Sequence, residues 1–171
     1  MVMERNFVIK PTSEEHLQDI LRLNEINVAV LAPLDLEQLK RLGGMAELFW
    51  VVEMNGKVAA FLIALREGQA YESVNYRWFA AHYERFLYVD RIVVAEGARK
   101  SGVGKALYEG VLAHAGRIGA PVVTAEIDIE PENAPSLRFH GSFGFCEVGQ
   151  QRVADGKKAV SLQALEVTDQ I

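Results

Sequence analysis

The feature that most constrains this chain is a strand-like run that ends in a glycine-bearing turn and opens into an amphipathic helix. The run covers residues 86–95, the turn carries Gly102 and Gly104, and the helix is expected to continue to Ile118. The first N–H groups of a helix have no helical partner and lie at the positive end of its dipole. Glycines let a ligand approach that backbone without a Cβ in the way. The turn therefore predicts a phosphate-binding loop.

Two common phosphate-binding motifs do not fit this turn. A Walker loop needs Gly-Lys followed by Ser or Thr; Gly97 and Gly102 have the right separation, but Val103 follows, and Gly104-Lys105 is followed by Ala106. A Rossmann fingerprint needs a third glycine where Leu107 stands. Neither motif therefore describes this turn, and a tight strand-to-helix turn without a ligand would also explain its two glycines.

A second motif follows the helix. After a strand-like run come Asn133, the small residue Ser136 three positions on, His140 seven positions on, and Gly144-Phe145. Together with Arg-x-x-Gly-x-Gly at residues 99–104, this pattern resembles the GNAT acetyltransferase superfamily. The Tyr-Arg-Trp-Phe stretch at residues 76–79 and Tyr-Val-Asp-Arg at residues 88–91 are similar to a bacterial subgroup of predicted acetyltransferases.

Periodicity along the rest of the chain predicts alternating strands and helices. Asn55-Gly56 and Asp155-Gly156 are hairpin turn signals, and Ser13 or Thr12 begins the first helix. The expected strands are 7–10, 48–54, 57–65, 86–95, 121–129, 144–153 and 157–167, and the expected helices are 13–23, 35–42, 102–118 and 136–142. This order, with the resemblance, implies an α+β (three-layer α/β) fold, with a mixed, mostly antiparallel sheet of about seven strands and helices on both faces. We expect a single GNAT acetyltransferase domain over residues 1–171.

Composition limits the classes of function. A net charge of −5 and a pI near 5.4 argue against a nucleic-acid binder, which needs a basic surface. No signal-peptide pattern or membrane-spanning run is seen, and the lone Cys146 implies no disulfide. These observations predict a cytoplasmic protein without membrane partners.

The resemblance implies that acetyl-CoA is the co-substrate. Backbone groups of Ile92 and Val94 would pair with the pantetheine arm, and the Val94 N–H would hold the thioester carbonyl. Asn133 would contact pantetheine, although a helix cap also explains it. The full expected set is Ile92, Val93, Val94, Arg99, Lys100, Ser101, Gly102, Val103, Gly104, Lys105, Asn133 and Ser136. No metal is expected, because His16, His82 and His114 lack ligand spacing and are expected at the surface.

Three residues are candidates for the proton steps of acyl transfer. Some members of the family carry a glutamate base at the position of Tyr88, and here the carboxylate lies two residues later, at Asp90. Asp90 is either a base or the partner of Arg91 or Arg85. His140 stands where the family usually has the tyrosine that protonates the thiolate; a half-buried, backbone-bonded histidine is the alternative.

The acceptor is expected to be an amine of a small molecule or peptide. The aromatic-rich connection 69–85 predicts a lid, with Asn75, Tyr76 and Trp78 as contacts, unless it forms a satellite core. Glu25 and Asn27 belong to a region that faces the acceptor in the family. Transfer of a longer acyl group, transfer to a hydroxyl acceptor, and assembly as a homodimer are alternatives that the sequence leaves open. A binding module that senses acyl-CoA without catalysis is the alternative from another functional class.

Overall fold

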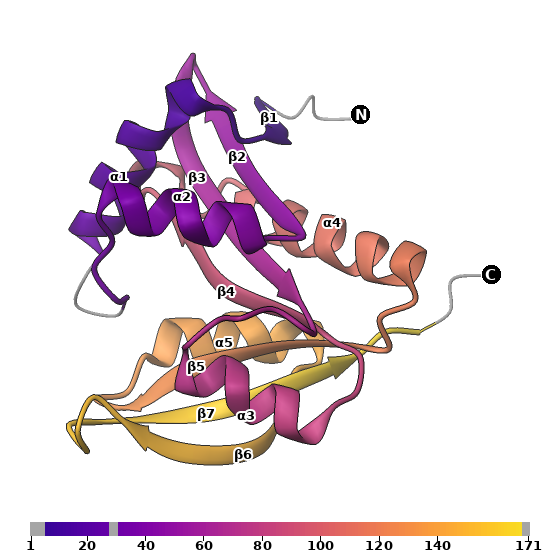
Figure 1. Ribbon diagram of the computed structural model, residues 1–171. Coiled ribbons are helices and arrows are strands. Elements are labelled where there is room, and N and C mark those ends of the chain that lie inside the picture. The colour runs from indigo at the N-terminus through magenta and orange to yellow at the C-terminus, as the bar shows by residue number, and fades with distance from the viewer. Residues whose placement is uncertain (1–5, 28–30, 169–171) are drawn as a thin grey trace. The chain divides into compact units, whose positions relative to one another are not determined.

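The computed structural model describes residues 6–27 and 31–168, which contain seven strands, five α-helices and two 3₁₀ helices (Figure 1). The strands are β1 (Phe7–Pro11), β2 (Leu48–Met54), β3 (Lys57–Arg66), β4 (Leu87–Val94), β5 (Val122–Glu130), β6 (Cys146–Val153) and β7 (Lys158–Glu166). The helices are η1 (Glu14–His16), α1 (Leu17–Ile26), α2 (Leu36–Met45), α3 (Val74–His82), η2 (Glu96–Ala98), α4 (Val103–Ile118) and α5 (Ala134–Phe143).

The strands form a seven-stranded sheet with the order β1-β2-β3-β4-β5-β7-β6. The pairs β1–β2, β2–β3, β5–β7 and β6–β7 are antiparallel, and β4–β5 is parallel. Asn55 and Gly56 both have positive φ, 54° and 75°, in the hairpin turn that their sequence predicts. The expected mixed, mostly antiparallel sheet is confirmed.

Contacts group the chain into two compact units, which we describe separately. Unit 1 comprises Met1–Leu65 and Asp90–Val111, and unit 2 comprises Arg66–Val89 and Leu112–Ile171. The boundary therefore runs through β4 and through α4. A single domain over residues 1–171 stays a prediction.

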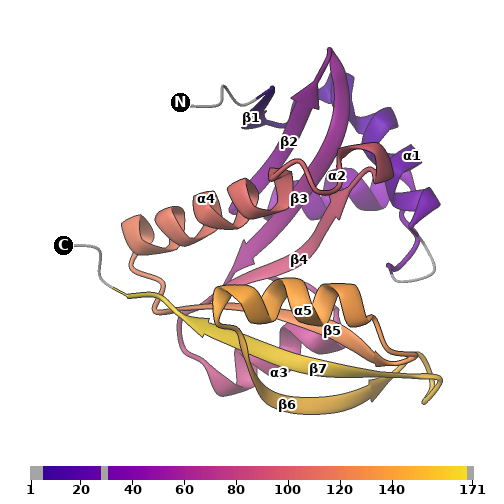
Figure 2. The same ribbon diagram turned by 180° about the vertical axis from the view of Figure 1, so that it is seen from behind.

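Unit 1 holds its strands between helices. α1 and α2 lie on one face of β2 and β3, and the first half of α4 lies on the other (Figures 1 and 2). α4 comes so close to β2 that a Cβ added to Gly110 would lie 3.1 Å from the Trp50 ring. Apolar side chains from the helices and from the strands between them are fully buried: Ile20, Leu39 and Leu107 on the helices, and Val51, Val52, Phe61 and Leu62 on β2 and β3.

His16 corrects a sequence expectation, because it is only 5% exposed instead of lying at the surface. Its Nδ1 accepts the backbone N–H of Ser13 (2.9 Å), so in the neutral ring the proton is on Nε2, which bonds Glu53 Oε1 (2.9 Å). The histidine thus links the start of the first helical segment to β2. His82 is exposed, as expected, and His114 is half-buried.

Unit 2 contains a helix that the pattern did not predict. α3 lies inside the connection 69–85, on the face of β5, β7 and β6 opposite to α5 (Figures 1 and 2). Ser73 Oγ accepts the N–H of Tyr76, and Tyr76 and Phe79 are buried against Tyr88. A serine cap followed by aromatic residues at 76, 79 and 83 is a helix pattern, but the density of aromatic residues obscured it.

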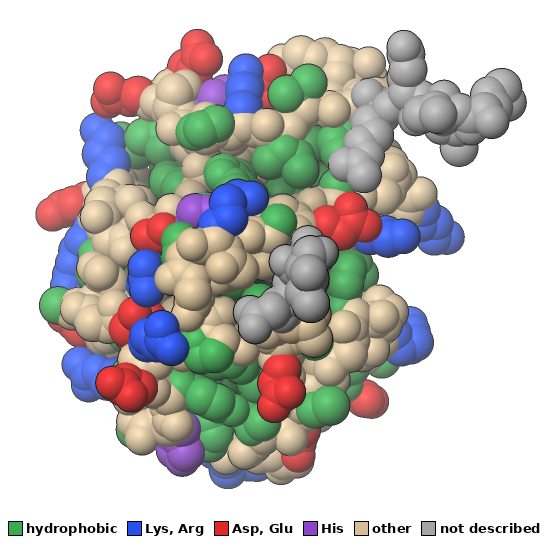
Figure 3. All heavy atoms as spheres, turned by 90° about the vertical axis from the view of Figure 1, so that its right-hand side faces the viewer, with side chains coloured by type: hydrophobic (Ala, Val, Ile, Leu, Met, Phe, Trp, Pro, Cys, Tyr) green, Lys and Arg blue, Asp and Glu red, His purple; other side chains and the backbone are tan. Residues whose placement is uncertain are grey.

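The surface mixes both signs of charge. Figure 3 shows Lys and Arg side chains interspersed with Asp and Glu on one face. In the described residues, no helix combines the length and the apolar character needed to cross a membrane.

Candidate functional site

The glycine-bearing turn presents a row of unpaired N–H groups. Ser101 N–H bonds Ala98 O, but across the described ranges no hydrogen bond is found from the N–H groups of Lys100 or of residues 102–105. Four of these belong to Gly102 and to the first three residues of α4, which lack acceptors in any helix. They are the orphaned polar groups that an anion would satisfy.

The backbone of the turn suits a phosphate. Lys100 and Gly102 have positive φ, 69° and 86°, and such alternation turns successive N–H groups toward one concave side. A Cβ added to Gly102 would meet nothing within 4 Å, so the space above it is open. Lys100 and Lys105 are exposed cations beside it, whereas the Val103 side chain is 1% exposed and contributes its N–H alone.

The end of β4 is connected to this turn by the short helix η2. Ile92 and Val94 are half-buried, as expected for residues that share one face, whereas Val93 is 4% exposed and packs in the core. Val93 would therefore contribute only backbone to a ligand.

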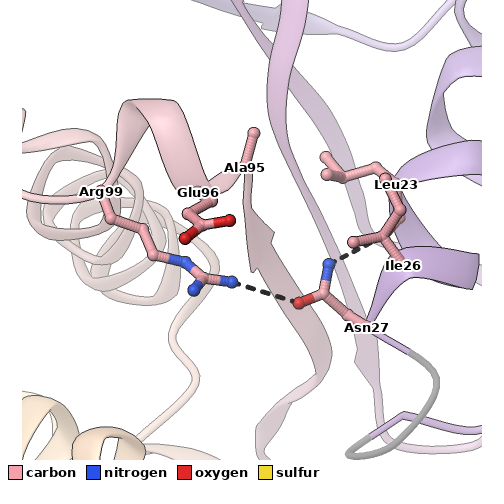
Figure 4. Close-up of a pocket in the computed structure, with 6 residues that line it drawn as sticks. All are labelled: Leu23, Ile26, Asn27, Ala95, Glu96 and Arg99. Atoms are coloured by element: carbon pink, nitrogen blue, oxygen red, sulfur yellow. Dashed lines mark hydrogen bonds between the residues drawn. The ribbon is translucent and has the colours of Figure 1, made fainter.

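Arg99 does not reach over the turn. Its side chain runs back to the end of β4, where Nε donates to Val94 O (3.2 Å). Nη2 donates to Asn27 Oδ1 at the end of α1 (3.2 Å) (Figure 4). Arg99 and Asn27 line a cavity of about 430 Å³ together with Leu23, Ile26, Ala95 and Glu96. Asn27 is thus brought to a pocket, while Glu25, predicted beside it, is exposed and does not line it.

Asp90 lies in a buried ion pair. Its Oδ2 is 2.7 Å from Arg91 Nε, and the two side chains are 4% and 5% exposed. Arg91 Nη1 also donates to Asn24 Oδ1 (2.9 Å) and Ala32 O (3.1 Å). The geometry matches the ion-pair alternative for Asp90, and its role as a base stays a prediction.

Tyr88 contacts a carboxylate that the sequence analysis missed. Its ring is fully buried, and its hydroxyl bonds Glu126 on β5, with O–O distances of 2.7 and 2.9 Å. The available signal was an acidic residue within a strand whose neighbours are apolar, because such a residue needs a partner when it is half-buried. A carboxylate therefore does stand beside the position of Tyr88.

His140 is buried on α5. Its Nδ1 lies 2.8 Å from Ser136 O, which can only accept, so Nδ1 carries the proton. Burial lowers the pKa of His140, and the hydrogen bond to the Ser136 carbonyl only partly opposes this. The ring is therefore neutral at pH 7, and an acid role would require protonating it against burial. Asn133 Oδ1 accepts the N–H of Ser136 (3.3 Å) and caps α5, as the alternative for Asn133 predicted.

The three residues predicted on the acceptor side of 69–85 have partners within unit 2. Tyr76 is 2% exposed, and its hydroxyl donates to Arg66 O (2.6 Å) and accepts from Gln69 N (3.0 Å). Asn75 Oδ1 accepts from Gln151 (2.7 Å). Trp78 stacks on His82, with ring centroids 3.7 Å apart. These contacts match the satellite-core alternative for Tyr76, and acceptor contacts by the three side chains stay a prediction.

The described ranges contain no group of three or more His, Cys, Asp or Glu that could hold a metal ion.

The sequence model described as the Acetyltransferase (GNAT) family matches residues 15–145. The chain belongs to this family.

Solved structures share the fold of this acetyltransferase-family member. Ard1 from Thermoplasma volcanium has a TM-score of 0.76 at 17% identity over 95% of this chain and 99% of that one. Arabidopsis thaliana NAA60, in complex with a bisubstrate analogue, has a TM-score of 0.75 at 15% identity over 96% and 99%. The Salmonella typhimurium protein yncA, with its cofactor acetyl-CoA, has a TM-score of 0.69 at 20% identity over 96% of each chain. No curated protein matches the chain.

Proposed function

We propose that this family member is an acetyl-CoA-dependent N-acetyltransferase whose acceptor, an amine of a small molecule or peptide, attacks the thioester directly. The observation that carries the proposal is the row of unpaired N–H groups at Lys100 and residues 102–105, which follow β4 and the short helix η2. Acetyl-CoA would supply an activated acetyl group. Its presence in the yncA structure supports this choice of co-substrate.

The residues of the turn divide the work of binding. The unpaired N–H groups would hold the pyrophosphate, with Lys100 and Lys105 adding charge. Ser101 Oγ donates to Ala98 O, so it stabilises the turn and would contribute to the site indirectly. Ile92 and Val94 would offer backbone groups to pantetheine. Asn133 would contact pantetheine through the side-chain amide. The Val94 N–H would polarise the carbonyl under attack.

The amine must lose a proton before or during attack. Presenting a lysine-like amine neutral at pH 7 costs about 4.6 kcal/mol. We propose Asp90 and the Tyr88–Glu126 pair as candidate proton acceptors. Arg91 Nε already occupies Asp90 Oδ2 at 2.7 Å, which favours the Tyr88–Glu126 pair. His140 would protonate the leaving thiolate only in its minor, charged form.

A non-catalytic acyl-CoA sensor of the same fold is the second candidate. Asp90 and His140 both have structural partners, which is the observation that favours it. Such a protein would bind acetyl-CoA without turnover.

Release of the CoA thiol from acetyl-CoA distinguishes the acetyltransferase from the non-catalytic sensor. Purified protein, acetyl-CoA and a panel of amines, amino acids and short peptides should release CoA thiol above the rate without acceptor, with N-acetylated product detected by mass spectrometry. A Gly104→Val protein controls for background hydrolysis. Tight binding of acetyl-CoA by calorimetry with no release for any acceptor would favour the sensor.

A further inference from the structure

The cavity beside α1 continues along one face of that helix. Its main part, about 430 Å³, lies between the C-terminal half of α1 and residues 95–99 (Figure 4). A second part of about 200 Å³ shares Leu23 and Ile26 and adds Asp19, Arg22, Lys57 and Val58. Residues 19, 22, 23, 26 and 27 follow helical spacing, so the groove is a property of one helix face.

The groove contains an arginine whose charge is not neutralised. Arg99 bonds only the neutral oxygens of Val94 and Asn27, and among the described residues no carboxylate lies within ion-pair distance of it. Arg22 in the neighbouring part differs, because its Nη1 is 2.8 Å from Asp19 Oδ1. A guanidinium has five N–H donors, so three remain for a ligand. The hydrogen bonds of Arg99 to Val94 and Asn27 also hold its guanidinium group in one orientation, which lowers the entropic cost of binding a carboxylate.

The remaining walls are apolar. Leu23 and Ala95 line the main part, and Ile26 is 74% exposed there, an exposure unusual for a large apolar side chain. Glu96 adds a single negative group at the same cavity. A ligand matched to this site carries a carboxylate, a positively charged or polar amine, and an apolar body.

We infer that the groove binds the carboxylate of an acceptor that is an apolar α-amino acid, with Arg99 as its partner and Leu23 and Ile26 against its side chain. The inference rests on the proposed function. It concerns Arg99 in particular, which the sequence analysis expected at the cofactor. The orientation of Arg99 favours the acceptor over a cofactor phosphate, because its side chain runs back to Val94 O and not over the N–H groups of the turn.

Three acceptors that share one alkyl group test this. L-Leucine, L-leucinamide and 3-methylbutylamine differ in whether a carboxylate is present. For the wild-type protein, kcat/KM for leucine should exceed that for the other two by roughly 10- to 100-fold, as for a hydrogen bond between charged groups. Arg99→Gln should abolish this preference, and Arg99→Lys should restore part of it. Arg152→Gln is the matched control and should retain the preference, because that arginine is exposed, is paired with Glu130 and does not line the groove.

A second experiment tests whether the anion that Arg99 binds is a phosphate of the cofactor instead of the acceptor carboxylate. If Arg99 instead binds the 3′-phosphate of CoA, Arg99→Gln would raise the KM for acetyl-CoA but not for 3′-dephospho-acetyl-CoA, with leucine no better than leucinamide. That pattern overturns the inference.

Binding without turnover keeps the inference distinct from the proposed function. Calorimetry should show leucine binding to the wild-type protein in the presence of CoA, at least tenfold weaker binding to Arg99→Gln, and unchanged binding to Arg152→Gln. If no amine is acetylated but this binding pattern holds, the proposed function fails and the site stands. If amines are acetylated and leucine has no advantage over 3-methylbutylamine, the site is wrong and the proposed function stands.

Discussion

Replacing Arg91 by methionine should destabilise the protein strongly. The change keeps an apolar stem but leaves the Asp90 carboxylate, 4% exposed, without the guanidinium that lies 2.7 Å away. It also removes the donor to Asn24 Oδ1 and Ala32 O, which joins β4 to α1 and to the segment that follows α1. Both effects act on one buried network in unit 1.

The magnitude follows from burial. Removing one partner of a buried pair costs about 3–5 kcal/mol, because the other charge stays in a site of low polarity. A domain of this length loses about 2–4 °C in Tm per kcal/mol, so Tm should fall by about 6–20 °C. Urea denaturation followed by circular dichroism, together with calorimetry, would measure both quantities.

Two further variants make the result decisive. Asp90→Asn combined with Arg91→Met removes both charges and should recover part of the loss, because no unpaired ion remains. Arg22→Met breaks an exposed pair, with side chains 71% and 46% exposed, and should change the free energy of unfolding by less than about 1 kcal/mol. The reasoning is refuted if Arg91→Met costs less than 1 kcal/mol, or if the double variant is no more stable than Arg91→Met.

Three other variants test the remaining site residues. Gly104→Val should abolish acetyl-CoA binding in calorimetry while circular dichroism stays native; unchanged affinity would remove the cofactor assignment of the turn. Burial holds the pKa of His140 below 6.5, so the folded state binds fewer protons than the unfolded state below that pH and stability falls as pH drops; His140→Phe should reduce this acid sensitivity. If His140 also donates the proton, the variant lowers kcat far more than acetyl-CoA affinity, and normal turnover leaves it a structural residue. Trp78→Ala should raise the acceptor KM by roughly 10- to 200-fold, equivalent to about 1–3 kcal/mol, if the indole lines a pocket. Because a Cβ added to Gly149 would lie 2.5 Å from this ring, loss of thermal stability in both Trp78→Ala and Gly149→Ala, without a change in KM, would make it a packing residue.

The sequence by itself determined the features that depend on neighbours along the chain. Asn55-Gly56 predicted its hairpin because few other residue pairs tolerate positive φ twice in succession. The glycine-bearing turn predicted the unpaired N–H groups, because every helix start leaves such donors and Gly102 adopts φ of 86° without strain. Except for α3, the element order followed from periodicity, and the mixed sheet followed from that order together with the family resemblance. Asn133 was correctly weighed as a cap.

Only the tertiary structure decided which side chains meet across the chain. His16 has the local sequence of a surface residue, and Glu53, thirty-seven residues away, gives it a partner that makes burial favourable. Tyr88 and Glu126 stand thirty-eight residues apart and meet because β4 and β5 pair in parallel. Arg99 and Asn27 are farther still, and no spacing rule relates them. Burial and charge pairing depend on contacts formed after chain collapse, so local patterns predict the backbone of the turn but not the direction of the arginine beside it.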